Sequence, residues 1–198
     1  MLDVSRETRT RLEAFCTLLT TWNSRINLIS RASIDDIWTR HIADSAQLLG
    51  LAPPHARHWV DLGTGGGFPG LVVAILAAEQ SPHLQITLVE SDRRKCAFLA
   101  VAAQATDITP TISVCRAEDL APLNADVVSA RALAPLSRLM PLAARHLAPS
   151  GMALFPKGTH VEGELQAVLE SWRFKVQKVP SQTDPTGVIL AIEDIARA

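Results

Sequence analysis

The segment from Asp61 to Gly70 constrains the fold more than any other part of the chain. It reads Asp-Leu-Gly-Thr-Gly-Gly-Gly-Phe-Pro-Gly, with a β-prone run before it and an apolar, helix-prone run after it. A strand, a glycine-rich turn and a helix in this order place free backbone N–H groups at a helix N-terminus. In open α/β folds that place lies at the carboxyl edge of the sheet, where ligands bind. The segment therefore predicts an α/β fold with a nucleotide-like ligand at this loop.

The remaining chain has the alternation that such a fold requires. Short β-prone runs occur at 59–62, 86–90, 111–115, 126–129 and 152–155. Between and after them, helical patterns occur at 69–79, 92–105, 135–147 and 160–172. This order predicts a parallel, Rossmann-like sheet with helices on both faces. Two further β-prone runs near the C-terminus have no helix between them, so we expect them to form an antiparallel hairpin.

The first 54 residues have a different texture and predict helices. Apolar residues recur at helical spacing over residues 5–22. A capping-box-like start at Ser33, with Asp36 three residues later, predicts a second helix that continues to about Leu48. We expect an N-terminal helical extension over residues 1–54 and one compact Rossmann-like unit over residues 55–198.

Composition excludes several protein classes. Hydrophobic residues make up 47% of the 198, enough for one large core, and the net charge is −1. The three cysteines are widely spaced and form no Cys-x-x-Cys pair, which predicts neither disulfides nor a metal site. The longest apolar run is too short to cross a membrane. The first residues mix both signs of charge without an apolar stretch, so we expect a cytoplasmic protein.

The glycines alone leave two ligands open. Gly65, Gly67 and Gly70 fit the dinucleotide pattern, and Glu90 follows at about the spacing of a ribose-binding acid. Asp61 favours a different ligand, because its carboxylate would repel a pyrophosphate but attract the positive charges of S-adenosylmethionine. The methyl donor is therefore the preferred cofactor. An NAD(P)-dependent oxidoreductase stays as the alternative, although the chain has no tyrosine for a Tyr-Lys proton donor.

Four further residues are candidates for binding the cofactor. The carboxylate of Glu90 can accept hydrogen bonds from both ribose hydroxyls. After the third predicted strand, the Ala117 N–H and the Glu118 carboxylate can recognise adenine, unless they only begin a helix. Arg131 follows the fourth strand and faces either the cofactor or the O6 edge of a guanine, or else pairs with Glu118 or Asp119.

The segment after the fourth strand narrows the acceptor. It reads Ser129-Ala-Arg-Ala-Leu-Ala-Pro135 and lacks the Asn/Asp-Pro-Pro-aromatic motif of enzymes that methylate exocyclic amines. No cysteine has the context of a covalent pyrimidine methylase. Guanine N7 carries no proton and fits what remains. Its methylation would need positioning and desolvation without a general base, so no catalytic residue is assigned beyond a possible positioning role of Arg131.

Several segments together resemble one family. They are Trp22-Asn-Ser-Arg-Ile-Asn-Leu-Ile29, Arg40-His-Ile-Ala-Asp-Ser45, Asp61 to Gly70, Ala117-Glu118, Ser129-Ala-Arg-Ala132 and Lys157-Gly158. The chain is similar over residues 10–195 to the RsmG (GidB) family of bacterial small-subunit rRNA guanine-N7 methyltransferases. The resemblance implies a class I S-adenosylmethionine-dependent methyltransferase fold with an N-terminal helical extension. It also implies a substrate, guanine-527 in the decoding-region loop of 16S rRNA, in free RNA or in the small ribosomal subunit.

The resemblance also assigns residues to roles. It implies cofactor contacts at Gly63, Phe68, Ala117, Glu118 and Arg131, with Phe68 contributing its backbone. The pattern of the loop and strands adds Asp61, Gly65 and Glu90 to these cofactor candidates. Candidates for the RNA side are Asn27, Arg40, His41 and Lys157, and His41 can instead pack the extension on the core. A non-catalytic rRNA-binding assembly factor is the second alternative.

Overall fold

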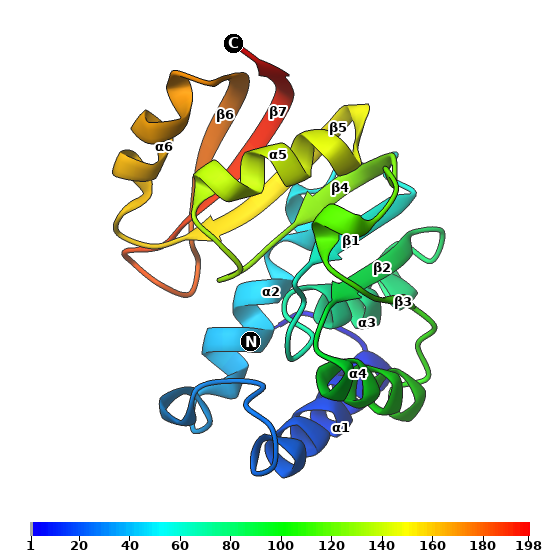
Figure 1. Cartoon of the computed structure of the whole chain (residues 1–198). Coiled ribbons are helices and arrows are strands. Elements are labelled where there is room, and N and C mark those ends of the chain that lie inside the picture. Colours follow the sequence, from blue (N-terminus) through cyan, green and yellow to red (C-terminus); the bar gives the residue numbers. More distant parts are fainter. Residues whose placement is uncertain (1) are drawn as a thin grey trace.

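The fold is that of a computed structural model of the chain, in which residues 2–198 are described. Its centre is one seven-stranded sheet with the strand order β3-β2-β1-β4-β5-β7-β6 (Figure 1). The strands are His58–Leu62 (β1), Gln85–Glu90 (β2), Thr111–Val114 (β3), Ala125–Ser129 (β4), Leu147–Lys157 (β5), Trp172–Pro180 (β6) and Val188–Arg197 (β7). The pairs among β1 to β5 are parallel, whereas β7 is antiparallel to both β5 and β6. The predicted parallel sheet with an antiparallel C-terminal hairpin is confirmed.

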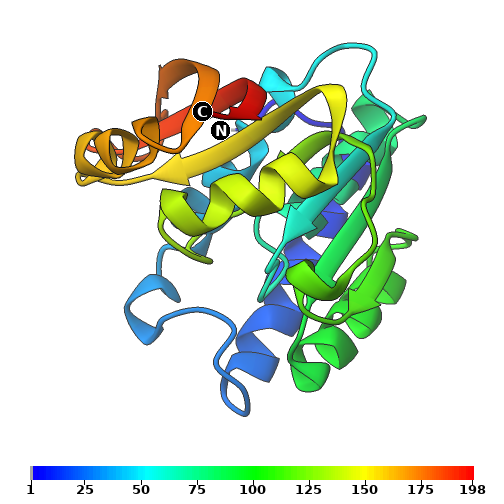
Figure 2. The ribbon, with the colours of Figure 1, turned by 45° about the horizontal axis from the view of Figure 1, so that its top comes forward.

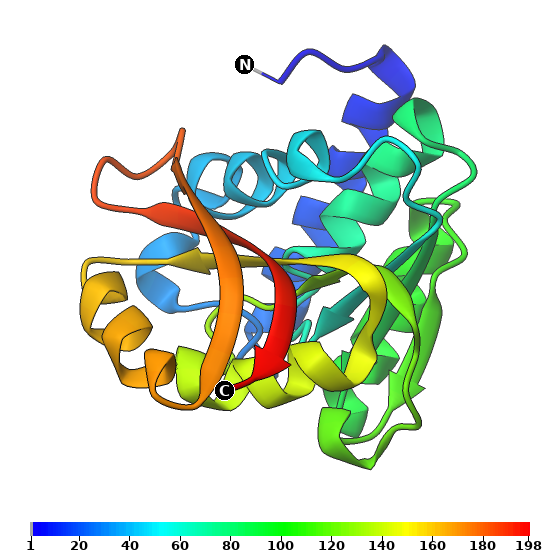
Figure 3. The ribbon, with the colours of Figure 1, turned by 90° about the horizontal axis from the view of Figure 1, so that it is seen from above.

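The helices form a layer on each face of the sheet. The α-helices are Arg6–Asn23 (α1), Asp44–Ala46 (α2), Gly70–Gln80 (α3), Arg93–Ala105 (α4), Leu136–His146 (α5) and Val161–Leu169 (α6). The short 3-10 or π segments are Arg31–Ser33 (η1), Trp38–Ala43 (η2), Leu49–Leu51 (η3) and Ala117–Asp119 (η4). Seen from above, α1 and α3 lie on one side of the sheet and α5 and α6 on the other (Figure 3). Figure 2 shows α5 lying across its face of the sheet.

The N-terminal helix packs on this core through the residues that its periodicity selects. Leu12, Phe15 and Leu19 of α1 are fully buried in one apolar cluster with residues of α3 and α4. The Phe15 ring lies 5.3 Å from the ring of Phe68 and 6.2 Å from that of Phe98, between centroids. Aromatic contacts at these separations are favourable. The α1 helix thereby touches the glycine loop directly, through Phe68.

The second predicted helix is wrong in its form. The helical part of this segment is a π-helix over Trp38–Ala43 that continues as one α-helical turn over Asp44–Ala46, and a separate 3-10 turn over Arg31–Ser33 precedes it. The Ser33 hydroxyl caps no helix, because it donates to the Ser30 carbonyl at 2.9 Å and lies 2.8 Å from Nε2 of His41. The capping-box interpretation failed since the hydroxyl was already engaged by this tertiary contact.

Within residues 2–198, no helix is long and apolar enough to span a membrane.

Candidate active site

The glycine loop follows β1 and leads into α3 at the carboxyl edge of the sheet. Gly63 has a φ of +65°, a left-handed conformation that favours glycine. A Cβ on Gly63 would also lie 2.5 Å from Cδ1 of Leu133, a residue of the segment after β4. Gly65 donates its N–H to Oε2 of Glu90 at 3.0 Å, which fixes the loop against the end of β2. The loop therefore keeps its backbone close to two neighbouring strand ends.

Asp61 lies beneath this loop and is fully buried. Its Oδ2 accepts a hydrogen bond from the Gly70 N–H at 2.9 Å, and its Oδ1 accepts one from the Ser129 hydroxyl at 2.6 Å. Ser129 in turn accepts a hydrogen bond from Nε1 of Trp59 at 2.8 Å. Burial raises the pKa of Asp61 to about 6, against the opposing effect of these hydrogen bonds. The carboxylate joins the loop, β1 and β4, and it does not line the cavity in front of the loop.

That cavity, of about 320 Å³, brings together most of the predicted cofactor residues. The predicted residues in its lining are Gly63, Gly65, Glu90, Ala117 and Glu118. Its volume is within the range of small-molecule sites. We call this space the loop cavity.

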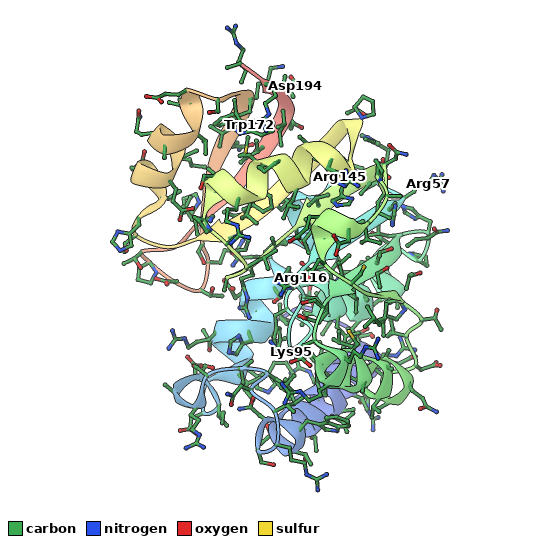
Figure 4. The ribbon with its side chains drawn as sticks, in the orientation of Figure 1. Arg57, Lys95, Arg116, Arg145, Trp172 and Asp194 are labelled. Atoms are coloured by element: carbon green, nitrogen blue, oxygen red, sulfur yellow. The ribbon has the colours of Figure 1, made fainter. Side chains whose placement is uncertain are left out.

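The loop cavity also has lining residues that the sequence analysis did not assign to the cofactor. Among them are Lys95 near the start of α4 and Arg116 after β3, both labelled in Figure 4. Leu133 and Ala134 close the cavity on the side of β4. Arg116 directly follows a predicted strand, so its place at the sheet edge was readable from the sequence. The position of Leu133 over Gly63 depends on a loop whose path the sequence does not define.

Arg131 lies outside the loop cavity and does not pair with Glu118 or Asp119. Its Nη1 lies 3.0 Å from Oδ2 of Asp44 and donates to the Arg40 carbonyl at 3.0 Å. Its guanidinium lies 5.1 Å from the centroid of the Phe68 ring. The predicted alternative partners are therefore wrong, because the N-terminal segment supplies a carboxylate, Asp44, that the one-dimensional sequence gives no means of placing here.

His41 completes this cluster. Its Nδ1 lies 2.7 Å from Nη2 of Arg131, and its ring lies 4.9 Å from the Phe68 ring. Burial, and then the charge of Arg131, lower the pKa of His41 to about 4. A neutral ring can accept the Arg131 N–H at Nδ1 and donate from Nε2 to Ser33. His41 and the buried Phe68 side chain thus hold the extension against the loop.

The other candidates for the RNA side are dispersed. Asn27 and Arg40 are exposed on the N-terminal segment. Lys157, at the end of β5, is largely buried and lies 2.8 Å from Oε2 of Glu164. No group of three or more His, Cys, Asp or Glu side chains in residues 2–198 is arranged to hold a metal ion.

A second cavity, of about 510 Å³, adjoins the first one. It lies beyond the ends of β4 and β5, and its lining includes Arg131, Lys157 and Glu164. Ala132, Leu133 and Ala134 line both cavities. We call this second space the acceptor cavity. A group bound in it would lie beside a ligand in the loop cavity, with the segment after β4 between them.

Ala132 has a strained backbone at this shared wall. Its φ is +53°, a left-handed conformation that is costly for a residue with a Cβ. Such strain is found preferentially at functional sites. It turns the chain so that Leu133 reaches Gly63.

Comparison with known proteins identifies the family. A family model described as "GidB: rRNA small subunit methyltransferase G" matches residues 8–187. A ribosomal RNA small subunit methyltransferase G from Ruegeria sp. (strain TM1040) is 51% identical over 196 residues, covering 99% of this chain and 95% of that protein. Another, from Rhodospirillum centenum, is 51% identical over 193 residues and covers 98% of this chain and 87% of that protein.

Solved structures of lower identity confirm the fold. The cofactor-bound protein Rv0187 from MTB superposes with a TM-score of 0.64 at 16% identity, covering 93% of this chain and 90% of that one. A SAM-dependent methyltransferase from Aquifex aeolicus gives a TM-score of 0.59 at 11% identity, with coverages of 89% and 97%. The expected class I methyltransferase fold is confirmed. By its family match and its close relatives, the chain belongs to the rRNA small subunit methyltransferase G (GidB) family.

Proposed function

We propose that the protein transfers a methyl group from S-adenosylmethionine to N7 of a guanine in 16S rRNA, at guanine-527 of the decoding-region loop. The observation that carries this proposal is the pair of adjoining cavities that share Ala132, Leu133 and Ala134. Family membership supports the rRNA substrate and the methyl donor. The particular guanine comes from the family resemblance. An rRNA substrate also supports a cytoplasmic location.

The residues of the loop cavity fit S-adenosylmethionine. The cavity offers the close backbone approach at Gly63 and two acidic side chains, Glu90 and Glu118, toward a ligand rich in hydroxyl and amine donors. Each oxygen of Glu90 already accepts one backbone hydrogen bond, from Gly65 at 3.0 Å and from Asp92 at 2.8 Å. A carboxylate oxygen can accept a second one, so Glu90 can be held in place by the protein and still bind ribose hydroxyls.

The residues around the cavities would position the acceptor. When bound, S-adenosylmethionine supplies the electrophilic methyl group. Guanine N7 has a free lone pair, so no side chain has to remove a proton. Ala132 and Leu133 would exclude water between the two cavities, and the Arg131 cluster would keep this segment in place. Such positioning and desolvation account for large rate enhancements.

Transfer of isotope tests the proposal. The protein is incubated with methyl-labelled S-adenosylmethionine and either 16S rRNA or small ribosomal subunits, and the RNA is digested to nucleosides. The proposal expects label in N7-methylguanosine. Label in another nucleoside, or in none with either substrate, would contradict it. Glu90→Gln should weaken binding of S-adenosylmethionine about tenfold by calorimetry, whereas Glu170→Gln, an exposed acid, should leave it unchanged.

A further inference from the structure

Attack at N7 does not by itself select guanine. Adenine also has an unprotonated N7, so the two purines differ only at positions 1, 2 and 6. Guanine presents the O6 acceptor beside donors at N1 and N2, whereas adenine presents an N6 donor beside the N1 acceptor. An enzyme that acts on one guanine in a loop therefore needs groups that read this edge, as proteins do for unstacked RNA bases.

A hydrogen-bond donor and an acceptor lie side by side in the lining of the acceptor cavity. Lys157 lies at the end of β5 and Glu164 on α6, and Nζ of Lys157 is 2.8 Å from Oε2 of Glu164. The Lys157 side chain is 9% exposed and that of Glu164 is 26% exposed. Both side chains are therefore sheltered from bulk water. At such a sheltered site a hydrogen bond to a base discriminates more strongly than it does at the surface.

Both side chains keep hydrogen-bonding capacity for a ligand. Nζ of Lys157 donates to Glu164 and to the Ala134 carbonyl at 3.2 Å, which leaves one of its three N–H groups. Oε2 of Glu164 accepts from Lys157 and from the Leu136 N–H, while Oε1 has no hydrogen-bond partner among residues 2–198. The remaining pattern, one donor beside one acceptor, complements O6 beside N1–H and N2–H₂.

The charge state of Glu164 suits an acceptor. Burial acts to raise its pKa, but the hydrogen bonds from Lys157 and the Leu136 N–H outweigh it and hold the pKa below the ordinary value for a glutamate. The side chain is therefore ionised at neutral pH and can only accept hydrogen bonds. It would be repelled by the N1 lone pair of adenine.

The other charged side chains that line the cavity each have a protein partner of their own. Arg131 and Asp44 pair with each other at 3.0 Å. Oδ1 of Asp184 accepts hydrogen bonds from the backbone N–H and the hydroxyl of Thr186, both at 2.8 Å. Lys157 donates a hydrogen bond to the carbonyl of Ala134, and Ala134 also lines the loop cavity. A base read by Lys157 and Glu164 would thus lie next to the methyl donor.

We infer that Lys157 and Glu164 are the specificity-determining residues for guanine: Glu164 Oε1 accepts from N1–H and N2–H₂, and Lys157 donates to O6. This inference rests on the proposed function and names how its site selects the base. A purely structural role, in which the pair only joins β5, α5 and α6, would leave the choice of base unchanged.

Substituted substrates separate these two roles. Small subunits are reconstituted with 16S rRNA that carries guanosine, inosine or adenosine at the target position, and kcat/KM is measured for methyl transfer there. Inosine retains O6 and N1–H but lacks the N2 amine. For the wild-type protein we expect inosine to be about tenfold slower than guanosine, and adenosine at least a hundredfold slower.

The Glu164→Gln variant is then measured with the same three substrates. It should slow guanosine about tenfold to a hundredfold and reduce the guanosine-to-inosine ratio to less than about twofold, because the lost contacts include the one to the N2 amine, the group that inosine lacks. The guanosine-to-adenosine ratio should fall too, since the Gln amide can donate to adenine N1. Glu162→Gln is the matched control: Glu162 lies on the same helix, bonds only the exposed Lys178 and should leave every ratio unchanged.

Two outcomes would overturn this inference and leave the proposed function intact. One is a wild-type protein that methylates inosine as fast as guanosine. This test does not depend on the folding of a variant. Another is a Glu164→Gln protein that binds S-adenosylmethionine normally by calorimetry and keeps the full tenfold preference. In both cases methylation of guanosine at N7 still supports the proposed function. If the wild-type protein transfers no methyl group to guanosine, the proposed function itself fails.

Discussion

Arg131 and Asp44 form an ion pair, with 3.0 Å between Nη1 and Oδ2, that ties the segment after β4 to the N-terminal helical segment. Both side chains are 18% exposed. The same guanidinium donates a hydrogen bond to the Arg40 carbonyl, and its Nη2 lies 2.7 Å from Nδ1 of His41. The wall between the two cavities is thus anchored by residues more than 80 positions away in the chain.

Removing the charge of Asp44 should loosen this anchor. We expect Asp44→Asn to lower the free energy of unfolding by about 1–3 kcal/mol, because the half-buried guanidinium of Arg131 loses a charged partner. Urea denaturation followed by circular dichroism measures this. Asp35→Asn, an exposed acid of the same segment, serves as the control and should change stability by less than about 0.5 kcal/mol. Equal stability of the two variants would show that the ion pair contributes nothing.

Ser129 connects the core of the sheet to the glycine loop. Its hydroxyl accepts from the Trp59 indole and donates to Asp61, both within 2.8 Å. Ser129→Ala leaves both buried groups short of one partner, so we expect a loss of about 2–4 kcal/mol in the free energy of unfolding. The exposed Ser24→Ala is the control, with an expected change below about 0.5 kcal/mol. A Ser129→Ala protein as stable as this control would remove the role assigned to the hydroxyl.

Asp61 should make the stability depend on pH in the mildly acid range. Its pKa is about 6 in the folded protein and 3.8 as a free side chain. A raised pKa in the folded state means that the contribution is fully present below pH 4 and is lost as the pH rises through 6. The loss corresponds to about 3 kcal/mol at 1.36 kcal/mol for each pKa unit.

The comparison of wild type with Asp61→Asn isolates this effect. Between pH 4 and pH 6.5 the wild-type protein should lose stability relative to the variant, and above pH 7 the difference should be constant. Denaturant titrations at several pH values give the two curves. Parallel curves over the whole range would mean that Asp61 titrates as it does in the unfolded chain.

Gly63 should tolerate no side chain without a loss of cofactor binding. An added Cβ would be strained at φ +65° and would lie 2.5 Å from Leu133 Cδ1. We expect Gly63→Ala to weaken binding of S-adenosylmethionine at least tenfold in calorimetry, with a stability cost of about 1–2 kcal/mol. Gly163→Ala, in α6 with open space around the new Cβ, should bind normally and be slightly more stable. Normal binding by Gly63→Ala would place the cofactor elsewhere.

The sequence predicts those features that depend on local pattern. The strands β1 to β4, the helices α3 and α5 and the C-terminal hairpin all follow from the alternation of β-prone and helix-prone runs. Gly63, Gly65, Glu90, Ala117 and Glu118 converge because parallel strands end at one edge of the sheet. Any residue directly after such a strand is a candidate by the same argument.

Long-range partners are what the sequence does not predict. Asp61 was expected to face the ligand, yet its carboxylate is taken up by Gly70 and Ser129. Ser33 was expected to cap a helix, but its hydroxyl lies against His41. Glu164 had no motif around it, and only the fold brings it to Lys157. In each case the decisive partner is a polar group whose position depends on the packed tertiary structure.

Methylation of a guanine at N7 makes the RNA chain sensitive to chemical cleavage at that nucleotide, which allows the modified position to be mapped. Small subunits or 16S rRNA that lack the modification are incubated with the protein and S-adenosylmethionine, treated with borohydride and aniline, and mapped by primer extension. The account predicts one new cleavage, at guanine-527, that requires both protein and cofactor. No new cleavage with either substrate, or cleavage only at other guanines, would contradict it.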